Sequence, residues 1–236
     1  MWDFEQGEVL AFDKPLRWTS FDLVAKVRYN LCRKLGKKKL KVGHSGTLDP
    51  LATGVVIVCT GKKTKLIESL QYDVKEYVAT MQLGATTPSY DMEKEVDATY
   101  PTEHITRALV DETIPQFLGE QWQVPPMFSA VQINGKRAYE LARKGQEVEL
   151  KPKLLKIDEI EVLSFEEKAM LLTIRVVCSK GTYIRALARD IGERLHSGAY
   201  LTALRRTRVG DTRVEDCLTI ERFLEQLNEI EYVQNE

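Results

Sequence analysis

A twelve-residue segment from Gly43 to Gly54, GHSGTLDPLATG, constrains the fold of this chain more than any other feature. It holds one acid, Asp49, and the proline that follows disfavours the helical backbone region for this residue. The unbroken apolar run from Val55 to Cys59 comes directly afterwards and predicts a buried strand. We therefore expect the Asp49 carboxylate to lie on a loop anchored by a core strand, which is a suitable position for a catalytic group.

A simpler interpretation of Asp49 is that it starts a turn before Pro50. Asp-Pro pairs are common in turns, because the aspartate side chain accepts a hydrogen bond from the main chain two residues further on. The dipeptide alone favours this structural role. The twelve-residue string as a whole favours a catalytic one.

Basic side chains are concentrated in two tracts, although the net charge of the chain is only -1. Residues 23–67 hold eleven Lys or Arg and one acid, and residues 180–213 hold eight basic residues and three acids. Residues 215–236 reverse this balance, with seven acids and one arginine. Single charged runs are usually solvated faces, but two basic tracts in one chain favour a nucleic-acid partner.

Composition and cysteine spacing limit the class of protein. With 236 residues, 43% of them hydrophobic, the chain can bury a sizeable core. No stretch reaches transmembrane length and the first residues are acidic, so we expect a cytoplasmic protein without a membrane segment. The four cysteines form no CxxC pair and the three histidines are scattered, which predicts free thiols and no metal site.

Local patterns predict both helices and strands. Thr19 and Asp22 match a capping box at the start of an amphipathic helix. In residues 76–83, apolar side chains occupy every second position and mostly polar ones lie between them, which predicts a half-buried strand. Pro115 interrupts a helical pattern, and Thr182 is expected to cap a further helix.

The string GHSGTLDPLATG resembles the motif that carries the catalytic aspartate in the TruB family of tRNA pseudouridine synthases. Other segments resemble further motifs of that family, in the family's order: residues 13–20, 75–77, 84–91, 132–142, 180–185 and 201–210. In the first of them, Arg17 stands where the family usually has glycine. The resemblance spans nearly the whole chain.

The resemblance implies a mixed α/β (α+β) pseudouridine synthase fold, with a largely antiparallel central sheet and flanking helices. It implies one catalytic domain over residues 1–236, with an inserted RNA-binding lobe at about 120–150. Residues from about 218 to 228 read as an amphipathic helix that closes the domain. Too few residues follow Arg213 for an independent core, so we expect no PUA domain.

The resemblance also assigns site residues. Asp49, Tyr77 and Arg185 are expected to be catalytic, with Tyr77 stacking on the uracil. We expect Arg185 to keep Asp49 ionised, because a guanidinium stays charged and binds carboxylates bidentately. The expected substrate-binding residues are His44, Tyr183, Leu204, Lys14 and Asp91.

The implied reaction is the isomerisation of uridine 55 in the TΨC loop of tRNA, by base flipping and aspartate-dependent cleavage and re-formation of the glycosidic bond. It involves no net oxidation, so we expect no cofactor and no metal. We expect the T arm of tRNA as the partner of a monomer that needs no protein partner. Asp49 is left with three possible roles: attack on C1′, attack on the base, or abstraction of a ribose proton.

Two other functions remain open. One is that of a related guide-RNA-dependent synthase, which shares these motifs. The other is a tRNA-folding chaperone for which catalysis is secondary.

Overall fold

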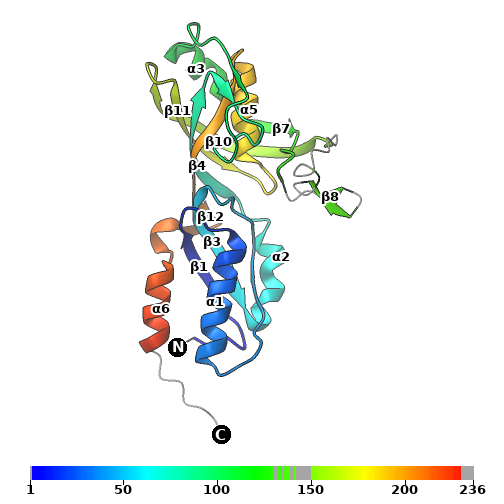
Figure 1. Ribbon diagram of the computed structural model, residues 1–236, viewed down its shortest axis with the longest axis vertical. Helices are drawn as coiled ribbons and strands as arrows, with labels where there is room; N and C mark the ends of the chain where they lie inside the picture. The colour runs from blue at the N-terminus through cyan, green and yellow to red at the C-terminus, as the bar shows by residue number, and fades with distance from the viewer. Residues whose placement is uncertain (1, 130–131, 134, 139–140, 142–149, 230–236) are drawn as a thin grey trace. The chain divides into compact units, whose positions relative to one another are not determined.

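The computed structural model describes residues 2–129, 132–133, 135–138, 141 and 150–229 (Figure 1). The chain divides into two compact units. Unit 1 comprises Met1–Lys75 and Arg205–Glu236, and unit 2 comprises Glu76–Leu204.

Unit 1 is built on strand β3 (Ala52–Thr60), which is buried at all but one of its positions and contains the apolar run predicted as a strand. Strand β1 (Val9–Lys14) pairs antiparallel with β3, with Lys14 opposite Gly54. Strand β2 (Val42–His44) also pairs antiparallel with β3. The chain therefore reaches β3 through a β2–β3 hairpin, and Asp49 lies in the connection.

The last part of strand β12 (Ala199–Val209) follows β3 in the strand order of unit 1. The short strand β13 (Thr212–Arg213) pairs back onto β12. Two short helices follow β3, namely the 3-10 helix η1 (Gly61–Leu66) and helix α2 (Ile67–Leu70). A further 3-10 helix, η3 (Val214–Asp216), follows β13.

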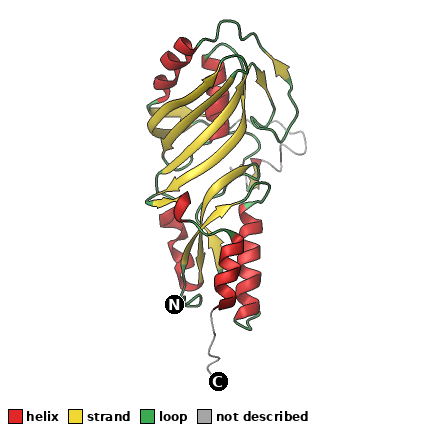
Figure 2. Cartoon of the chain, turned by 90° about the vertical axis from the view of Figure 1, so that its left-hand side faces the viewer, coloured by secondary structure: helices red, strands yellow, loops and turns green. Residues whose placement is uncertain are grey.

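Helices α1 (Ser20–Lys34) and α6 (Ile220–Glu229) lie side by side in unit 1 (Figures 1 and 2). Helix α1 begins with the predicted capping box of Thr19 and Asp22. The Lys34 ammonium donates to the carbonyl of Asn228 at 3.3 Å, which links the two helices. The rings of Phe12 and Phe223, both fully buried, meet edge to face at 5.4 Å and join α6 to β1.

Unit 2 contains the strand order β12-β4-β11-β10-β7, to which β12 contributes its first part. Strand β4 (Lys75–Leu83) alternates between buried and partly exposed side chains from Tyr77 onwards, as predicted. Strand β10 (Lys153–Glu166) pairs antiparallel with both β11 (Leu171–Cys178) and β7 (Gly119–Gln123).

Helix α5 (Ile184–Arg194) supplies seven buried residues to unit 2. Helix α3 (Arg107–Thr113) runs into the 3-10 helix η2 (Ile114–Phe117), so the pattern that Pro115 interrupts forms two short helices. Two small antiparallel pairs complete the described part of this unit. They are β5 (Ala85–Thr86) with β6 (Ala98–Thr99), and β8 (Gln132–Ile133) with β9 (Lys136–Arg137).

These elements confirm the predicted fold class, a mixed α/β fold with a mostly antiparallel sheet and flanking helices (Figure 2). A helix occupies Ile220–Glu229, where a closing helix was expected. Most of the expected RNA-binding lobe at 120–150 lies outside the described residues after position 129. That lobe and the single catalytic domain stay predictions. No helix in the described ranges is long and apolar enough to cross a membrane.

Candidate functional site

The Asp49 loop, which we define as residues 45–51, joins β2 to β3 in unit 1. At its start the Ser45 amide donates to the carbonyl of Ile57 on β3 at 3.0 Å. At its end the Ala52 amide donates to the carbonyl of Asp49 at 3.0 Å. Asp49 itself is partly buried. The loop is thus closed by main-chain hydrogen bonds at both ends.

The segment before α1 and the first residue of that helix hold the Asp49 loop from one side. The amide of Leu48 donates to the buried Ser20 hydroxyl at 2.9 Å, and this hydroxyl lies 3.3 Å from the Leu48 carbonyl oxygen. The amide of Arg17 donates to the carbonyl of Pro50 at 2.7 Å. Both neighbours of Asp49 in the sequence are therefore bound to this segment.

Arg206 on β12 holds the same loop through its guanidinium. Its side chain is almost fully buried, with the residue 3% exposed. It donates to the carbonyls of Val55 at 2.7 Å, Gly46 at 3.3 Å and Thr47 at 3.4 Å. Gly54 permits this close packing, because a Cβ on Gly54 would lie 2.1 Å from the Arg206 carbonyl oxygen.

Arg17 adopts a left-handed backbone conformation, with a φ of 67°. This conformation is easy for glycine and unfavourable for other residues. The family glycine at this position therefore matches a backbone requirement that this chain meets with arginine. Since the Arg17 amide binds the Pro50 carbonyl, the strained residue is also a contact of the Asp49 loop.

Lys14, at the end of β1, is a fully buried cation beside the Asp49 loop. Its ammonium donates to the carbonyls of Trp18 at 2.6 Å and Pro15 at 3.0 Å. Burial lowers the pKa of Lys14 to about 8. The negative charge of Asp49 raises this pKa more than any other group does, but less than burial lowers it. Arg206 lowers the pKa further. Lys14 and Asp49 attract each other when both are ionised.

His44 lies on β2, just before the Asp49 loop, and is partly buried. Burial lowers the pKa of His44 and so does the charge of Arg206, while the Gly46 backbone raises it. The Nδ1 atom of His44 is buried and has no hydrogen-bond partner within the described part of the chain. The lowered pKa favours the neutral form of the imidazole at physiological pH.

Arg185 and Asp91 come together in unit 2. Arg185, on α5, is 5% exposed and its Nε lies 3.7 Å from the Asp91 carboxylate. Its guanidinium also donates to the carbonyls of Phe128 at 2.9 Å and Ser89 at 3.2 Å. The Asp91 carboxylate accepts hydrogen bonds from the Ser89 hydroxyl at 2.6 Å and the Glu93 amide at 2.9 Å. Four further groups therefore fix this pair.

Tyr183 lies at the N-cap of α5, one residue later than the expected cap at Thr182. That prediction was wrong because the Thr182 hydroxyl donates to the Ser179 carbonyl at 3.0 Å. The side chain of Gln123 instead accepts from the Tyr183 amide at 2.9 Å and donates to its carbonyl at 3.2 Å.

Tyr77 and Leu204 lie on neighbouring strands of unit 2, β4 and β12. Tyr77 is buried, and Leu204 is partly exposed. The residue before Tyr77, Glu76, accepts two hydrogen bonds from the Arg175 guanidinium, at 2.7 and 3.0 Å. The start of β4 is therefore fixed by an ion pair to β11.

Three residues that contact the Asp49 loop or the residue next to Asp91 were not singled out from the sequence as site residues. Ser20 and Arg206 bind the Asp49 loop, as described above. Arg189, one helical turn after Arg185, donates to the Val124 carbonyl at 3.1 Å and packs over the Tyr90 ring at 5.1 Å. In the sequence, the motif at residues 201–210 pointed to the segment that contains Arg206. A motif does not show which carbonyls a side chain binds.

Within the described residues, no group of three or more His, Cys, Asp or Glu side chains is placed to bind a metal ion. All four cysteines are free thiols. Lys14 is influenced by the charges of both Asp49 and Arg206.

Two protein-family models match consecutive parts of the chain. The model described as the TruB family pseudouridylate synthase N-terminal domain matches residues 33–184. The model described as the tRNA pseudouridylate synthase B C-terminal domain matches residues 185–235.

The chain is also similar to bacterial proteins over almost its whole length. A protein of Phocaeicola vulgatus named tRNA pseudouridine synthase B is 68% identical over 236 residues, covering 99% of this chain and 100% of that protein. A protein of Flavobacterium johnsoniae with the same name is 51% identical over 226 residues, covering 95% of this chain and 98% of that protein.

Among solved structures, a chain of a Cbf5-Nop10-Gar1 complex matches with a TM-score of 0.70 and 29% identity. A chain of an H/ACA RNP bound to a substrate RNA containing 2'-deoxyuridine matches with a TM-score of 0.68 and 27% identity. Each match covers 97% of this chain, which spans only 58% and 57% of those chains.

The strain at Arg17 gives a stability prediction. A left-handed non-glycine residue costs roughly 1–2 kcal/mol, and the entropy of glycine in the unfolded chain offsets roughly 0.5–1 kcal/mol of any gain. We expect Arg17→Gly to unfold at the same or a higher urea concentration than wild type. Arg17→Val is the matched control, because a β-branched residue fits this conformation worst. It should destabilise the protein by about 1 kcal/mol or more. A large loss of stability in Arg17→Gly would contradict the conformation described here.

Proposed function

The chain belongs to the TruB family of pseudouridylate synthases and converts uridine in tRNA to pseudouridine, and we propose that its target is uridine 55 in the TΨC loop. The observation that carries this proposal is the Asp49 loop, whose family motif is held in place by Arg17, Ser20 and Arg206. The two basic tracts of the sequence support an RNA substrate.

Formation of pseudouridine breaks the bond between N1 of uracil and C1′ of the ribose, turns the base and forms a bond between C5 and C1′. The C5 proton leaves and N1 gains a proton, so the product is an isomer of the substrate. We propose that the reaction uses side chains alone, with no cofactor or metal. An ionised carboxylate is the group it needs beside the sugar, either as a nucleophile or as a base. Asp49 is our candidate, in any of its three possible roles.

We propose that Lys14 favours the ionised form of Asp49. A carboxylate enclosed with an uncharged base tends to take up a proton unless a cation stabilises its charge. Lys14 is a cation whose electrostatic attraction to Asp49 is already present in unit 1. The role first assigned to Arg185, which was to keep Asp49 ionised, stays a prediction.

The remaining residues are proposed to hold the flipped uridine. Extrusion of a base from a folded RNA loop costs a few kcal/mol, and stacking groups offset that cost. We assign stacking on the uracil to Tyr77, and contacts to the rest of the nucleotide to Tyr183 and Leu204. Neutral His44 is suited to stack in the RNA where the base has departed. Asp91 is assigned to hold Arg185, since it forms an ion pair with that residue.

One other function has a specific observation in its favour, namely guide-RNA-dependent modification. The similarity to a chain of the Cbf5-Nop10-Gar1 complex supports it. Against it, the full-length relatives at 51 to 68% identity are named tRNA pseudouridine synthase B. We therefore propose a monomeric, cytoplasmic enzyme that modifies tRNA without a guide RNA or a protein partner. Modification of tRNA only after a guide RNA is added would contradict this.

The Asp49 variant tests the catalytic assignment. We expect Asp49→Asn to leave less than about a hundredth of the wild-type rate, because losses of this size are typical for an essential catalytic group. Its affinity for tRNA should stay within about threefold of wild type. The carboxylate that is replaced contributes little to phosphate contacts, which supply most of the affinity. The measurement is a pseudouridine map of unmodified tRNA treated with each protein.

The map also tests the target position. Wild type should produce a new pseudouridine at position 55 and Asp49→Asn none. Modification at another position would contradict the proposed target. A chaperone role would be favoured if Asp49→Asn restored growth to cells that lack this modification.

The pKa of Lys14 gives a prediction about pH. Because burial lowers this pKa to about 8, the amine is charged below that pH and neutral above it. The rate of the chemical step should therefore fall as the pH rises from 7 to 9, with a midpoint near 8. In Lys14→Met the rate should be lower and independent of pH over this range. A wild-type rate that stays constant from pH 7 to 9 would exclude a role for the Lys14 charge.

A further inference from the structure

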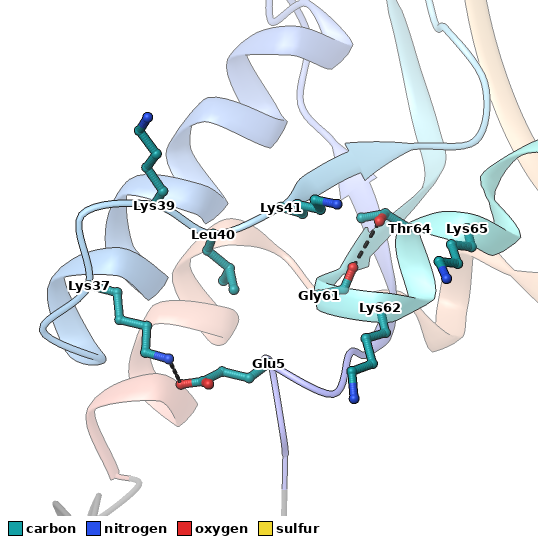
Figure 3. Close-up of a pocket in the computed structure, with 9 residues that line it drawn as sticks. All are labelled: Glu5, Lys37, Lys39, Leu40, Lys41, Gly61, Lys62, Thr64 and Lys65. Carbon is teal, nitrogen blue, oxygen red and sulfur yellow. Dashed lines mark hydrogen bonds and ion pairs between the residues drawn. The ribbon is translucent and has the colours of Figure 1, made fainter.

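A pocket ringed by lysines lies in unit 1, at the end of β3 away from the Asp49 loop. It has a volume of about 460 Å³ and is formed by the chain between α1 and β2, by η1 and by the N-terminal segment (Figure 3). Its lining residues are Glu5, Lys37, Lys39, Leu40, Lys41, Gly61, Lys62, Thr64 and Lys65. We name it the lysine pocket.

Main-chain contacts give the lysine pocket a fixed frame. The Gly61 amide donates to the Lys41 carbonyl at 2.9 Å, and the Thr64 hydroxyl donates to the Gly61 carbonyl at 2.8 Å. Gly61 has a φ of 52°, and a Cβ there would lie 2.2 Å from the Glu5 carbonyl oxygen. The three chain segments are thus packed backbone to backbone. The lysines extend from positions that are fixed, although their own side chains are exposed.

The charge of the lysine pocket is strongly positive. Five lysines and one glutamate line it, which gives a formal net charge of +4. Glu5 forms an ion pair with Lys37, and the Lys62 ammonium donates to the Gln6 side chain at 2.7 Å. Lys39, Lys41 and Lys65 have no carboxylate partner within 4.0 Å among the described residues. These three ammonium groups are available to an anion.

The chemistry of the lining indicates the kind of anion. Lysine binds phosphate as a point charge, without the planar geometry that arginine imposes. The lining holds no aromatic side chain on which a base could stack. Contacts to phosphate position a nucleic acid without reading its sequence. The lysine pocket therefore fits the backbone of a nucleic acid better than a nucleotide base.

We propose that the lysine pocket binds backbone phosphates of the substrate tRNA, outside the site that holds the target uridine. This proposal rests on the tRNA substrate and deepens it by naming a second contact. The pocket begins at Gly61, directly after β3, and the Asp49 loop ends directly before β3. At about 3.3 Å per residue, the nine residues of β3 span roughly 30 Å between the end of the Asp49 loop and the pocket. The contact therefore adds to binding and leaves the chemical step unchanged.

The test compares two double variants of equal charge. Lys41→Gln/Lys65→Gln removes two ammonium groups from the lysine pocket. Lys153→Gln/Lys168→Gln removes two exposed ones outside both basic tracts, on β10 and in the β10–β11 turn. Dissociation constants for full-length tRNA are measured from 50 to 200 mM salt, each variant also carrying Asp49→Asn so that no turnover occurs. Rates are measured for the same double variants without that substitution.

We expect the pocket variant to bind tRNA about tenfold more weakly at low salt. Its plot of log affinity against log salt should be shallower by about 1 for each lysine that contacts a phosphate. Its kcat should stay within about twofold of wild type while its KM rises. The control variant should change the slope by less than half as much.

Equal affinities and slopes for the two double variants would overturn the proposal, and so would a loss confined to kcat. Failure of the proposed function would look different. In that case wild type would bind tRNA no better than an unrelated RNA of the same length, before any lysine is changed.

Discussion

The position of Asp49 depends on the hydrogen bonds that the buried guanidinium of Arg206 donates. It binds carbonyls at the start of the Asp49 loop and on β3, so it joins β12 to both sides of the connection. Ser20 binds the Leu48 amide, and the Arg17 amide binds the Pro50 carbonyl. A buried main-chain group without a partner costs about 1–3 kcal/mol, so the buried contacts to Val55 and Leu48 oppose movement of the loop.

The same region holds two buried positive charges. Lys14 is buried and charged at neutral pH, and Arg206 carries a second buried positive charge close enough to lower the pKa of Lys14. Two cations in one buried region repel each other, and an ionised Asp49 relieves that repulsion. The lysine pocket adds exposed positive charge further along β3. Unit 1 thus combines the carboxylate that we propose to be catalytic with surroundings that suit a polyanionic substrate.

The structural features that the sequence predicted are those that depend on residues close together in the chain. The capping box at Thr19, the strand after Asp49 and the alternation of β4 each follow from a local pattern. Contacts between distant segments could not be predicted in this way, because Arg206 and Gly46 are 160 residues apart. The prediction that Thr182 caps α5 was wrong because its hydroxyl binds the Ser179 carbonyl, while the Tyr183 amide is bound by Gln123 from 60 residues away.

The most direct test of this account is the kinetics of Arg206→Met on tRNA. If Arg206 positions the Asp49 loop, kcat should fall at least tenfold while the dissociation constant for tRNA stays within about threefold. Added guanidinium should restore part of the lost rate, because it can occupy the vacated site and bind the same carbonyls. A variant that is less stable to heat but retains the wild-type kcat when folded would contradict the account. Arg206 would then stabilise the fold without positioning Asp49 for the reaction.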